Sequence, residues 1–344
     1  MVQRLAVFIG RFQPFHNGHR AMVQTALAAA DRVLVLIGSP DASLSLKNPF
    51  SADQRRNMIE SVFSADIAAD RLLIEPVPDT TYNENAWIAD VQRIIERISA
   101  GEPVELCRVE AAGRTDAAGG PFSSWTPLVI ESPFPDLDGT RLRTDYFADP
   151  SSLPPDACPE PVTGMLADYR ATDAFGALVE EAEFLRRFRA SWAQAPYEPI
   201  FTTVDALVVQ SGHLLVIRRG RAPGKGLLAL PGGFLDPNEP LRDAAIRELR
   251  EETRISDRHG ELSAEYLATH IRDAATKVFD APYRSARGRT VTHCFLIRLP
   301  DSDPLYTVTG SDDAEAAHWI PLGALDPCDF FEDHYAIVQV MLGV

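Results

Sequence analysis

The sequence predicts an α/β protein of two consecutive domains, the first of which has a parallel sheet with helices on both faces. This prediction rests on three features of the chain. Its first forty residues alternate apolar runs with an Ala-rich segment, in the order strand, helix, strand. Its 344 residues are too many for one ordinary core. After a break at residues 195–199, which include two prolines, the pattern restarts as β-rich, so we expect domains at residues 1–193 and 194–344.

The composition restricts partners and location. A formal net charge of −16 disfavours nucleic-acid binding and requires local cations around any polyphosphate ligand. The chain contains no run of eighteen apolar residues and enters a strand directly, so we expect neither a membrane span nor a signal peptide. The four cysteines are scattered and form no CxxC pair, which suits a reducing compartment. We therefore expect a cytoplasmic protein that binds neither nucleic acid nor membranes, and a homo-oligomer is compatible with the sequence.

The first loop of the chain is predicted to bind phosphate. Residues 5–9 form an apolar run typical of a buried parallel strand, residues 20–30 favour a helix, and residues 33–37 are a second buried strand. Because such a crossover is right-handed, the loop lies at the carboxyl edge of the sheet, where backbone N–H groups and the helix dipole converge on an anion. His16 and His19 are three apart and can face one ligand. The alternative is a plain turn or a zinc pair, but the loop has no Cys or carboxylate to complete a zinc site.

Residues 10–19 read Gly-Arg-Phe-Gln-Pro-Phe-His-Asn-Gly-His and resemble the signature of the nucleotidyltransferases, close to that of the nicotinamide mononucleotide (NMN) adenylyltransferases. The resemblance implies a Rossmann-like nucleotidyltransferase domain that uses ATP. It implies catalytic roles for His16 and His19. It also implies contacts to ATP and its phosphates from four other residues of the loop, namely Gly10, Arg11, Phe12 and Gly18.

A second basic segment follows the second strand. Ser51 and Gln54 form a capping box that starts a helix reaching about residue 63. Lys47, Arg55 and Arg56 either line a phosphate path or serve packing alone. The Lys-Asn-Pro-Phe-Ser stretch that begins at Lys47 resembles the corresponding segment of NMN adenylyltransferases, which implies that Lys47 binds phosphate.

The third predicted strand is at residues 71–77. The helix that follows it begins with a tryptophan among polar residues. From Trp87 onward the apolar side chains recur at helical spacing, so Trp87 is either part of the core stripe or an aromatic platform at the mouth of the helix. The Tyr-Asn-x-Asn-x-Trp arrangement resembles the bacterial NMN adenylyltransferases that carry a second domain. The resemblance favours stacking of the nicotinamide ring on Trp87, with its amide bound by Asn83 or Asn85.

A further anion site is predicted after strands at residues 103–109 and 126–131, which flank a loop at residues 111–120. Thr140 can cap the next helix, and Arg141 and Arg143 lie on its first turn. The nucleotidyltransferases have a second signature here, Ser-x-Ser/Thr-x-x-Arg. Thr140 and Arg143 match it, which implies phosphate binding by Thr140 and Arg141 and a catalytic role for Arg143. Asp138 replaces the first Ser and would repel phosphate unless it is itself a cap.

The second half is predicted to begin with a β-hairpin. Two apolar runs, at residues 201–210 and 214–218, flank a turn at residues 211–213. Residues 273–289 carry four basic side chains and are either a lid over an anionic substrate or a solvated loop. Residues 151–161, with four prolines, are expected to be a surface loop. The remaining expected elements are strands at residues 264–271, 290–299 and 316–321, and helices at residues 172–192, 241–253 and 331–342.

One of these helices, at residues 241–253, is predicted to bind a metal ion. Glu248, Glu251 and Glu252 fall within an arc of about 100° on this helix. Carboxylates so close repel one another, and a hard cation such as Mg²⁺ or Mn²⁺ relieves that repulsion and holds a pyrophosphate. Arg247 can pair with one of these glutamates. The alternative is a solvated helix face rich in Glu and Arg.

The segment from Gly233 to Ile255, with Glu239 and the Arg-Glu-Leu-Arg-Glu-Glu run between them, resembles the Nudix box. The resemblance implies a Nudix α/β/α sandwich domain. It implies metal ligation by Glu248, Glu251, Glu252 and the backbone of Gly233, and catalytic roles for Arg247, Glu251 and Glu252.

One position departs from the Nudix pattern, because Arg254 stands where the family usually has Gly. A left-handed Arg here costs on the order of 1 kcal/mol, but no metal ligand is lost, so we expect hydrolysis to survive. The family often takes its catalytic base from a loop outside the box. The candidates are Asp312, Asp313 and Glu315, and the sequence does not choose among them.

Together the two resemblances imply a bifunctional NMN adenylyltransferase/Nudix hydrolase (ADP-ribose pyrophosphatase) whose partners are small-molecule nucleotides. The first domain would transfer AMP from ATP to NMN, giving NAD and pyrophosphate. The second would hydrolyse ADP-ribose to AMP and ribose 5-phosphate with Mg²⁺. Three alternatives remain open at this point. The first domain could adenylylate a different phosphate, and the second could act on another nucleoside diphosphate derivative or serve as a ligand-sensing module.

Overall fold

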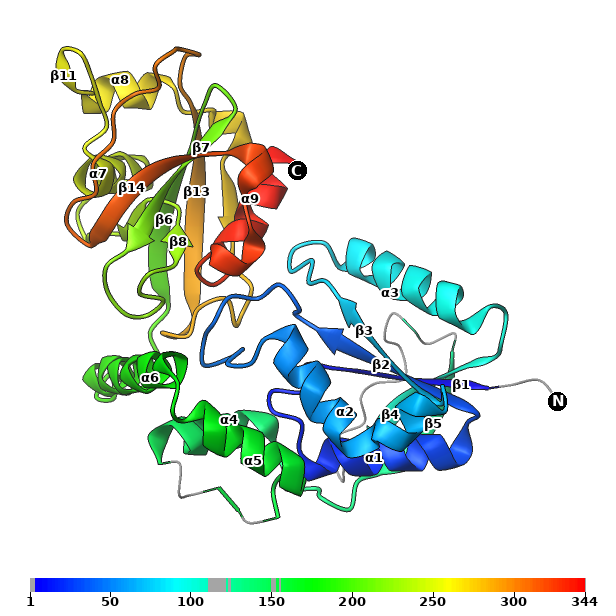
Figure 1. The fold of residues 1–344 in the computed structure, drawn as a ribbon. Helices are drawn as coiled ribbons and strands as arrows, with labels where there is room; N and C mark the ends of the chain where they lie inside the picture. The colour runs from blue at the N-terminus through cyan, green and yellow to red at the C-terminus, as the bar shows by residue number, and fades with distance from the viewer. Residues whose placement is uncertain (1–3, 111–121, 123–124, 150–152, 155, 344) are drawn as a thin grey trace. The chain divides into compact units, whose positions relative to one another are not determined.

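The computed structural model describes residues 4–110, 122, 125–149, 153–154 and 156–343, and it divides into two compact units, Met1–Ala182 and Glu183–Val344 (Figure 1). The loop predicted at residues 111–120 lies outside the described residues. The division falls within the long helix α6 (Asp173–Ser191), so the domain boundary at residue 193 stays a prediction.

The first unit contains a five-stranded sheet whose order is β3-β2-β1-β4-β5. All four strand pairings are parallel, as predicted. Because β1 pairs with β2 on one side and with β4 on the other, the strand order reverses at β1, which is where open α/β sheets bind ligands. The strands are β1 (Leu5–Gly10), β2 (Arg32–Gly38), β3 (Leu72–Val77), β4 (Val104–Glu110) and β5 (Thr126–Glu131).

Helices cover both faces of this sheet because its strands are apolar on both faces. Ala6 and Phe8 of β1 belong to a core that also includes residues of α1 (Asn17–Ala29) and α2 (Ala52–Ala68). Leu5 and Val7 point to the opposite core, which α3 (Glu84–Ser99) completes. Figure 1 shows α3 on the side of the sheet away from α1 and α2. The remaining helices of the unit are α4 (Gly139–Ala148), α5 (Glu160–Tyr169) and the first part of α6.

Helix α5 was not predicted, because the prolines around it suggested a loop. Pro159 and Pro161 instead stand at its start, where proline has no helical hydrogen bond to lose. Val162, Leu166 and Tyr169 are then buried on one face of the helix. Their helical spacing is the signal that could have revealed it.

The second unit is built on a mixed seven-stranded sheet, of which the order β12-β13-β6-β7-β14 forms the main path. The predicted hairpin is confirmed, and its turn has positive φ at both Ser211 and Gly212, as a type I′ turn requires. Helices α7 (Leu241–Thr253) and α9 (His334–Leu342) flank the sheet (Figure 1). The strands are β6 (Phe201–Gln210), β7 (His213–Arg219), β8 (Leu228–Ala229), β9 (Gly232–Phe234), β12 (Lys277–Phe279), β13 (Thr290–Arg298) and β14 (Ala314–Pro321).

The strand predicted at residues 264–271 is wrong, because the segment forms helix α8 (Ala264–Thr269). The Oγ of Ser263 caps this helix by accepting a hydrogen bond from the backbone N–H of Tyr266. Six residues are too few for periodicity to separate a helix from a strand. The smaller elements are β10 (Ser256–Asp257), β11 (Gly260–Glu261) and the 3₁₀ turns η2 (Asp273–Ala275), η3 (Leu322–Ala324) and η4 (Pro327–Asp329).

Across the described residues, none of the helices has the length and apolar character needed to cross a membrane.

Candidate active sites

The loop after β1 has a fixed shape that depends on Gly10 and Phe12. Phe12 has a left-handed backbone with φ of 54°, and its buried ring packs against Phe8 and Phe15. A Cβ on Gly10 would lie 2.9 Å from Cζ of this ring, so only glycine leaves the ring its space. The two residues therefore shape the loop, and their direct contact with ATP stays a prediction.

His16 and His19 stand at the start of α1 and cap it together. His16 is the N-cap residue, and its Nδ1 accepts a hydrogen bond from the backbone N–H of His19 at 3.3 Å. In return, Nδ1 of His19 accepts one from the backbone N–H of His16. The two rings stack with centroids 3.6 Å apart. Since both Nδ1 atoms are acceptors, the neutral rings carry their protons on Nε2 and offer two parallel N–H donors.

Burial keeps both histidines neutral. It lowers the pKa of His16 to about 4, with the Asp138 charge raising it and that of Arg143 lowering it further. Burial also lowers the pKa of His19 well below its ordinary value. A Cβ on Gly18 would lie 3.0 Å from the His16 ring, so Gly18 allows this close packing. The pair can therefore donate hydrogen bonds to a phosphate at neutral pH without carrying charge.

Arg143 on α4 joins three segments at this site. Its guanidinium donates hydrogen bonds to the carbonyl oxygens of Gln13 (2.7 Å), Leu46 and Gly139. Its side chain is 8% exposed, and burial lowers its pKa to about 10. None of these partners is a carboxylate, so the positive charge remains available to an anionic ligand. A Cβ on Gly139 would lie 3.7 Å from the His16 ring, which places the start of α4 against His16.

The prediction that Thr140 caps α4 is wrong. Asp138 is the N-cap, and its Oδ1 accepts a hydrogen bond from the backbone N–H of Arg141 at 2.8 Å. The sequence predicts that Asp138 repels phosphate unless it caps the helix, and Asp138 does cap the helix. A carboxylate on the residue before a helix can accept a hydrogen bond from the third backbone N–H of the helix, as a hydroxyl can. Asp138 therefore takes the N-cap position that was predicted for Thr140. Thr140 lies in the first turn, where its Oγ1 accepts from Arg143 at 3.2 Å.

A fully buried arginine, Arg55, supports the loop and was not assigned this role from the sequence. It is 1% exposed and donates to the carbonyl oxygens of Arg11, Gly38 and Ser39. Arg56 donates to Ile74. The packing alternative therefore holds for Arg55 and Arg56.

The cationic groups implied to bind phosphate differ in their surroundings. Arg11 has a buried Nη1 without a hydrogen-bond partner among the described residues, and its charge lowers the pKa of both Arg55 and Arg143. Arg141 points to solvent and lies 3.8 Å from Asp145. Lys47 is exposed, on the segment whose Leu46 carbonyl binds Arg143. The structure thus gathers Arg11 and Arg143 at the loop but leaves Arg141 outside it.

Trp87 lies in the first turn of α3 and is half-buried in the core that this helix covers. The centre of its ring lies 5.6 Å from that of Phe122, which stacks on Trp125. Asn83 is the N-cap of α3, and its Oδ1 accepts from the backbone N–H of Ala86. Asn85 is exposed. Trp87 therefore belongs to the core stripe, and the roles of these three residues in NMN binding stay predictions.

The second candidate site lies along α7, where Arg247 holds three carboxylates. It binds Glu239 through two nitrogens, at 2.7 and 3.1 Å, and also contacts Glu248 at 2.8 Å and Glu251 at 2.9 Å. The bonds to Glu239, followed by those to Glu248 and Glu251, raise the pKa of Arg247. The predicted pairing of Arg247 with a glutamate is confirmed.

Two of the glutamates are shielded from solvent, Glu252 fully and Glu248 in part. Glu252 is 4% exposed, and its Oε2 accepts a hydrogen bond from the backbone N–H of Gly232 at 2.9 Å. Burial raises the pKa of Glu252 to about 8 and also raises that of Glu248. A Cβ on Gly233 would lie 2.7 Å from Cδ of Glu248, so Gly233 makes room for this carboxylate.

The residues fit a divalent metal ion. Their donors are oxygens, which Mg²⁺ and Mn²⁺ prefer, and buried carboxylates with raised pKa values are stabilised by a cation. Within the described part of the chain, no three His, Cys, Asp or Glu side chains already form a metal-binding cluster. Glu248 and Glu251 are both paired with Arg247.

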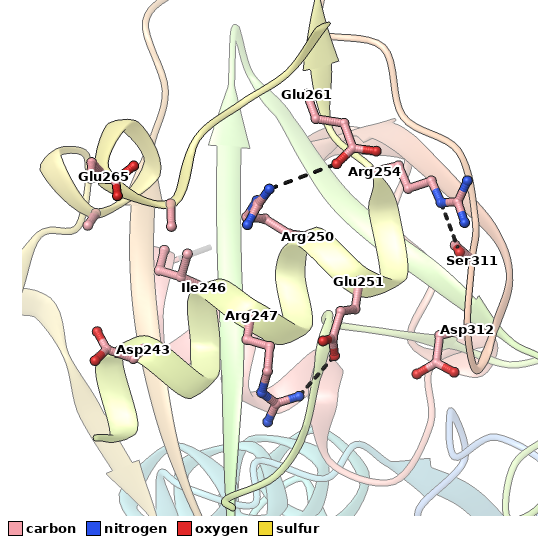
Figure 2. Close-up of a pocket in the computed structure, with 12 residues that line it drawn as sticks. Asp243, Ile246, Arg247, Arg250, Glu251, Arg254, Glu261, Glu265, Ser311 and Asp312 are labelled. Atoms are coloured by element: carbon pink, nitrogen blue, oxygen red, sulfur yellow. Dashed lines mark hydrogen bonds and ion pairs between the residues drawn. The ribbon is translucent and has the colours of Figure 1, made fainter. Parts of the chain in front are cut away.

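A hollow of about 1060 Å³ lies along the outer face of α7. Figure 2 shows Arg247 and Glu251 paired at this surface, with Asp312 beside them. Of the three candidate bases, Asp312 lines the hollow, Asp313 pairs with Arg221 at 2.7 Å, and Glu315 is exposed at the start of β14.

Two half-buried arginines near Glu252 were missed or left undecided by the sequence. The Cζ of Arg219 lies 4.2 Å above the ring of Phe331, and that of Arg287 lies 5.0 Å above the ring of Phe234. Burial lowers the pKa of both, and each repels another guanidinium. Neither forms an ion pair within 4.0 Å among the described residues. They are suited to a polyanion.

The segment at residues 273–289 is neither wholly a lid nor a solvated loop. It contains β12, and its Arg284 is buried in a two-bond ion pair with Asp333, with both distances 2.8 Å. Arg284 therefore holds the segment to the body of the unit, and Arg287 is the side chain left available.

These geometries define a class of protein, a two-domain enzyme with a nucleotidyltransferase site and a Nudix site. Family comparison agrees, since residues 7–97 match the cytidylyltransferase-like model and residues 200–340 match the NUDIX domain model. A nicotinamide/nicotinic acid mononucleotide adenylyltransferase of Acinetobacter baylyi is 31% identical over 141 residues, which are 41% of this chain and 74% of that relative. A nicotinamide-nucleotide adenylyltransferase of Thermococcus kodakarensis is 38% identical over 98 residues, or 28% of this chain and 51% of that relative.

A solved structure from Francisella tularensis matches both units. It is a bifunctional NMN adenylyltransferase/ADP ribose pyrophosphatase complexed with AMP and a Mn ion, 33% identical, covering 99% of each chain with a TM-score of 0.89. A second structure of such an enzyme from the same organism gives 34% identity and a TM-score of 0.90. The chain belongs to the family of bifunctional enzymes that join an NMN adenylyltransferase to an ADP-ribose pyrophosphatase of the Nudix type.

Proposed function

We propose that the first domain transfers AMP from ATP to NMN, giving NAD and pyrophosphate, and that the second hydrolyses ADP-ribose to AMP and ribose 5-phosphate. The observation that carries the first activity is the stacked His16–His19 pair beside the buried Arg143. For the second it is the buried Glu252 carboxylate and the half-buried Glu248 carboxylate, at the point where Gly232 and Gly233 approach α7. We take the domains as residues 1–193 and 194–344.

In the first domain, an oxygen of the NMN phosphate attacks the α-phosphorus of ATP, and the bond to the β-phosphate breaks as pyrophosphate leaves. The attacking group is already an anion, so no general base is needed. The two Nε2–H donors of His16 and His19 bind phosphate oxygens, while Arg143 and Arg11 offset the charge that accumulates on them. Thr140 and Lys47 complete the phosphate contacts, and Trp87 with Asn83 or Asn85 holds the nicotinamide.

In the second domain, water adds to one phosphorus of the diphosphate and the bridging P–O bond breaks. Glu248, Glu251, Glu252 and the carbonyl oxygen of Gly233 would hold Mg²⁺ or Mn²⁺, which supplies charge neutralisation and activation of the water. Arg247 keeps Glu248 and Glu251 oriented toward this site. Arg219 and Arg287 bind the diphosphate oxygens.

We further propose that the protein works in the cytoplasm on small-molecule nucleotides, with Mg²⁺ as the usual metal. The full chain lacks any surplus of positive charge, with 33 basic against 49 acidic residues, which argues against nucleic acid as a partner.

The test assays both reactions on the full-length protein. With ATP, NMN and Mg²⁺, the parent should form NAD, and His16→Ala should lose that activity while still releasing AMP from ADP-ribose. Glu252→Gln should show the reverse pattern. A parent protein that forms no NAD but adenylylates another phosphate, or that binds ADP-ribose without turnover, would refute the corresponding half. A panel of nucleoside diphosphate derivatives then checks whether ADP-ribose has the highest kcat/KM.

Trp87→Ala checks the second substrate of the first domain. The stacking role requires a higher KM for NMN and an unchanged KM for ATP. An unchanged KM for NMN would assign Trp87 to the core alone, where it already contacts Phe122.

A further inference from the structure

Arg254 ends the Nudix helix in a backbone conformation that is unfavourable for arginine. It is the C-cap of α7, with φ of 41° and ψ of 41°, and its backbone N–H donates to the carbonyl of Arg250 at 3.0 Å. A left-handed residue at this position is usually glycine, because Cβ approaches the following carbonyl oxygen. A strained residue that is retained beside a candidate active site suggests that its side chain has a task.

The side chain of Arg254 reaches a loop from a distant part of the sequence. Its Nε donates a hydrogen bond to Oγ of Ser311 at 3.0 Å (Figure 2). The same loop is hydrogen-bonded to the end of α7 through its backbone, from Ser311 N to the Glu252 carbonyl and from Thr309 N to the Thr253 carbonyl. The end of α7 and the loop are therefore one connected structure, and Arg254 provides its side-chain contact.

This loop carries Asp312 to the catalytic glutamates. Asp312 is exposed, has φ of 55°, and borders the same hollow as Glu251 (Figure 2). Arg247, which pairs with Glu251, borders this hollow as well. No hydrogen bond or ion pair joins Asp312 to another described residue.

The residues on either side of Asp312 are anchored, whereas Asp312 is not. Ser311 is bound by Arg254 and by the Glu252 carbonyl, and Asp313 is bound by Arg221 and by the backbone N–H of Gly220. The next carboxylate, Glu315, lies on β14 beyond the turn. Among the three candidate bases, Asp312 alone is presented to the glutamates with a free carboxylate.

We propose that Arg254 is a positioning residue of the hydrolase, which acts through Ser311 to hold Asp312 at the hollow beside Glu251 as the base for the attacking water. The inference rests on the proposed ADP-ribose hydrolysis. Asp312 accepts one proton from the water as its oxygen bonds to phosphorus. The electron pair of the broken P–O bond leaves on the departing phosphate, which needs no proton, and Asp312 returns its proton to solvent.

The test compares five single variants of the full-length protein, Arg254→Gly, Arg254→Lys, Ser311→Ala, Asp312→Asn and, as the control, Arg258→Ala. Arg258 is exposed and lies four residues beyond Arg254. Among the described residues its side chain bonds only to His259, so its loss removes the same charge without touching the loop. The readouts are kcat and KM for ADP-ribose with Mg²⁺, the pH profile of kcat, and the unfolding temperature of the protein.

The expected pattern separates positioning from structural support. Arg254→Gly relieves the left-handed strain and should raise the unfolding temperature by about 2–4 °C, yet lower kcat by about tenfold with little change in KM. Ser311→Ala should lower kcat similarly without that stabilisation, and Arg254→Lys should retain more of kcat than Arg254→Gly. Asp312→Asn should lower kcat by about a hundredfold and remove the acidic limb of its pH profile.

Two results would overturn the inference. One is parent-like kcat in Arg254→Gly or in Asp312→Asn. The other is a double variant, Arg254→Gly with Asp312→Asn, whose kcat falls by the product of the two single-variant factors. If Arg254 acts through Asp312, the double variant should lose no more kcat than Asp312→Asn alone. A parent protein that releases no AMP from ADP-ribose would instead refute the proposed hydrolase itself, which keeps the two failures distinct.

Discussion

Gly233→Ala should damage the hydrolase while leaving the fold and the adenylyltransferase intact. A Cβ at this position would lie 2.7 Å from Cδ of Glu248 and 2.9 Å from its Oε2. Gly233 lies in β9, where it pairs with Val204 of β6, and its φ is not positive. Its backbone conformation is therefore compatible with alanine. The other carboxylate oxygen, Oε1, would lie closer still, so the carboxylate must retreat by about 1 Å to reach an ordinary contact of 3.4 Å. Because Glu248 is the end of a flexible side chain, the free energy of unfolding should change by less than about 1 kcal/mol.

A shift of this size in a metal-binding carboxylate should lower kcat for ADP-ribose by about tenfold to a hundredfold. The assay is release of AMP from ADP-ribose over a range of Mg²⁺ concentrations, with NAD formation by the same sample as the internal reference. Gly323→Ala is the matched control, because a Cβ at Gly323 meets no atom within 4 Å. Parent-like kcat and Mg²⁺ dependence in Gly233→Ala would show that the Glu248 position is not critical, and the reasoning from close packing would fail.

Other consequences concern protonation and capping. Burial lowers the pKa of His334 to about 3, so the unfolded chain binds this proton at a higher pH than the folded chain does. The free energy of unfolding should therefore fall as the pH drops from 6.5 toward 3. Urea titration at each pH should show a smaller fall in His334→Gln. His16, with a pKa of about 4, stays neutral, so the rate of NAD formation should show no inflection from its titration between pH 6 and 8. Asp138→Ala removes the cap of α4 and should lower the free energy of unfolding by about 1 kcal/mol, measured by denaturant titration.

The sequence predicted the elements whose pattern extends over many residues. The strands β1 and β2 are apolar for five consecutive residues, and the helix Leu241–Thr253 begins and ends at the predicted residues. Shorter elements were misassigned because a few residues sample less than two helical turns. The segment Ala264–Thr269 is the example, since only the hydroxyl of Ser263 distinguishes its helical start from a loop before a strand.

Side-chain geometry was predictable only where the partners are close in sequence. The pairing of Arg247 with Glu251 follows from their spacing of four on one helix. The ion pair of Arg284 with Asp333 joins residues 49 apart, and no periodicity links them. Such contacts depend on the packing of separate elements. The sequence therefore did not distinguish Arg284 from the other cations of its loop, although Arg284 is among the most buried charged residues that the structure describes.

The two sites differ in the sign of the charge that each leaves uncompensated. In the first unit, Arg143 and Arg55 are buried against carbonyl oxygens, and the two histidines are held neutral. Positive charge therefore faces the loop with no carboxylate among the hydrogen-bond partners that the structure describes for the two guanidinium groups. In the second unit, Glu252 is buried and Glu248 is half-buried, and the arginine that pairs with Glu248, Arg247, is shared with Glu239 and Glu251. Leaving a charge buried and unpaired is expensive, so each arrangement is stable only as far as a ligand of opposite sign completes it. In the proposed reactions, a polyphosphate would do so in the first unit and a divalent cation in the second, which is how a chain with a net charge of −16 would provide for both.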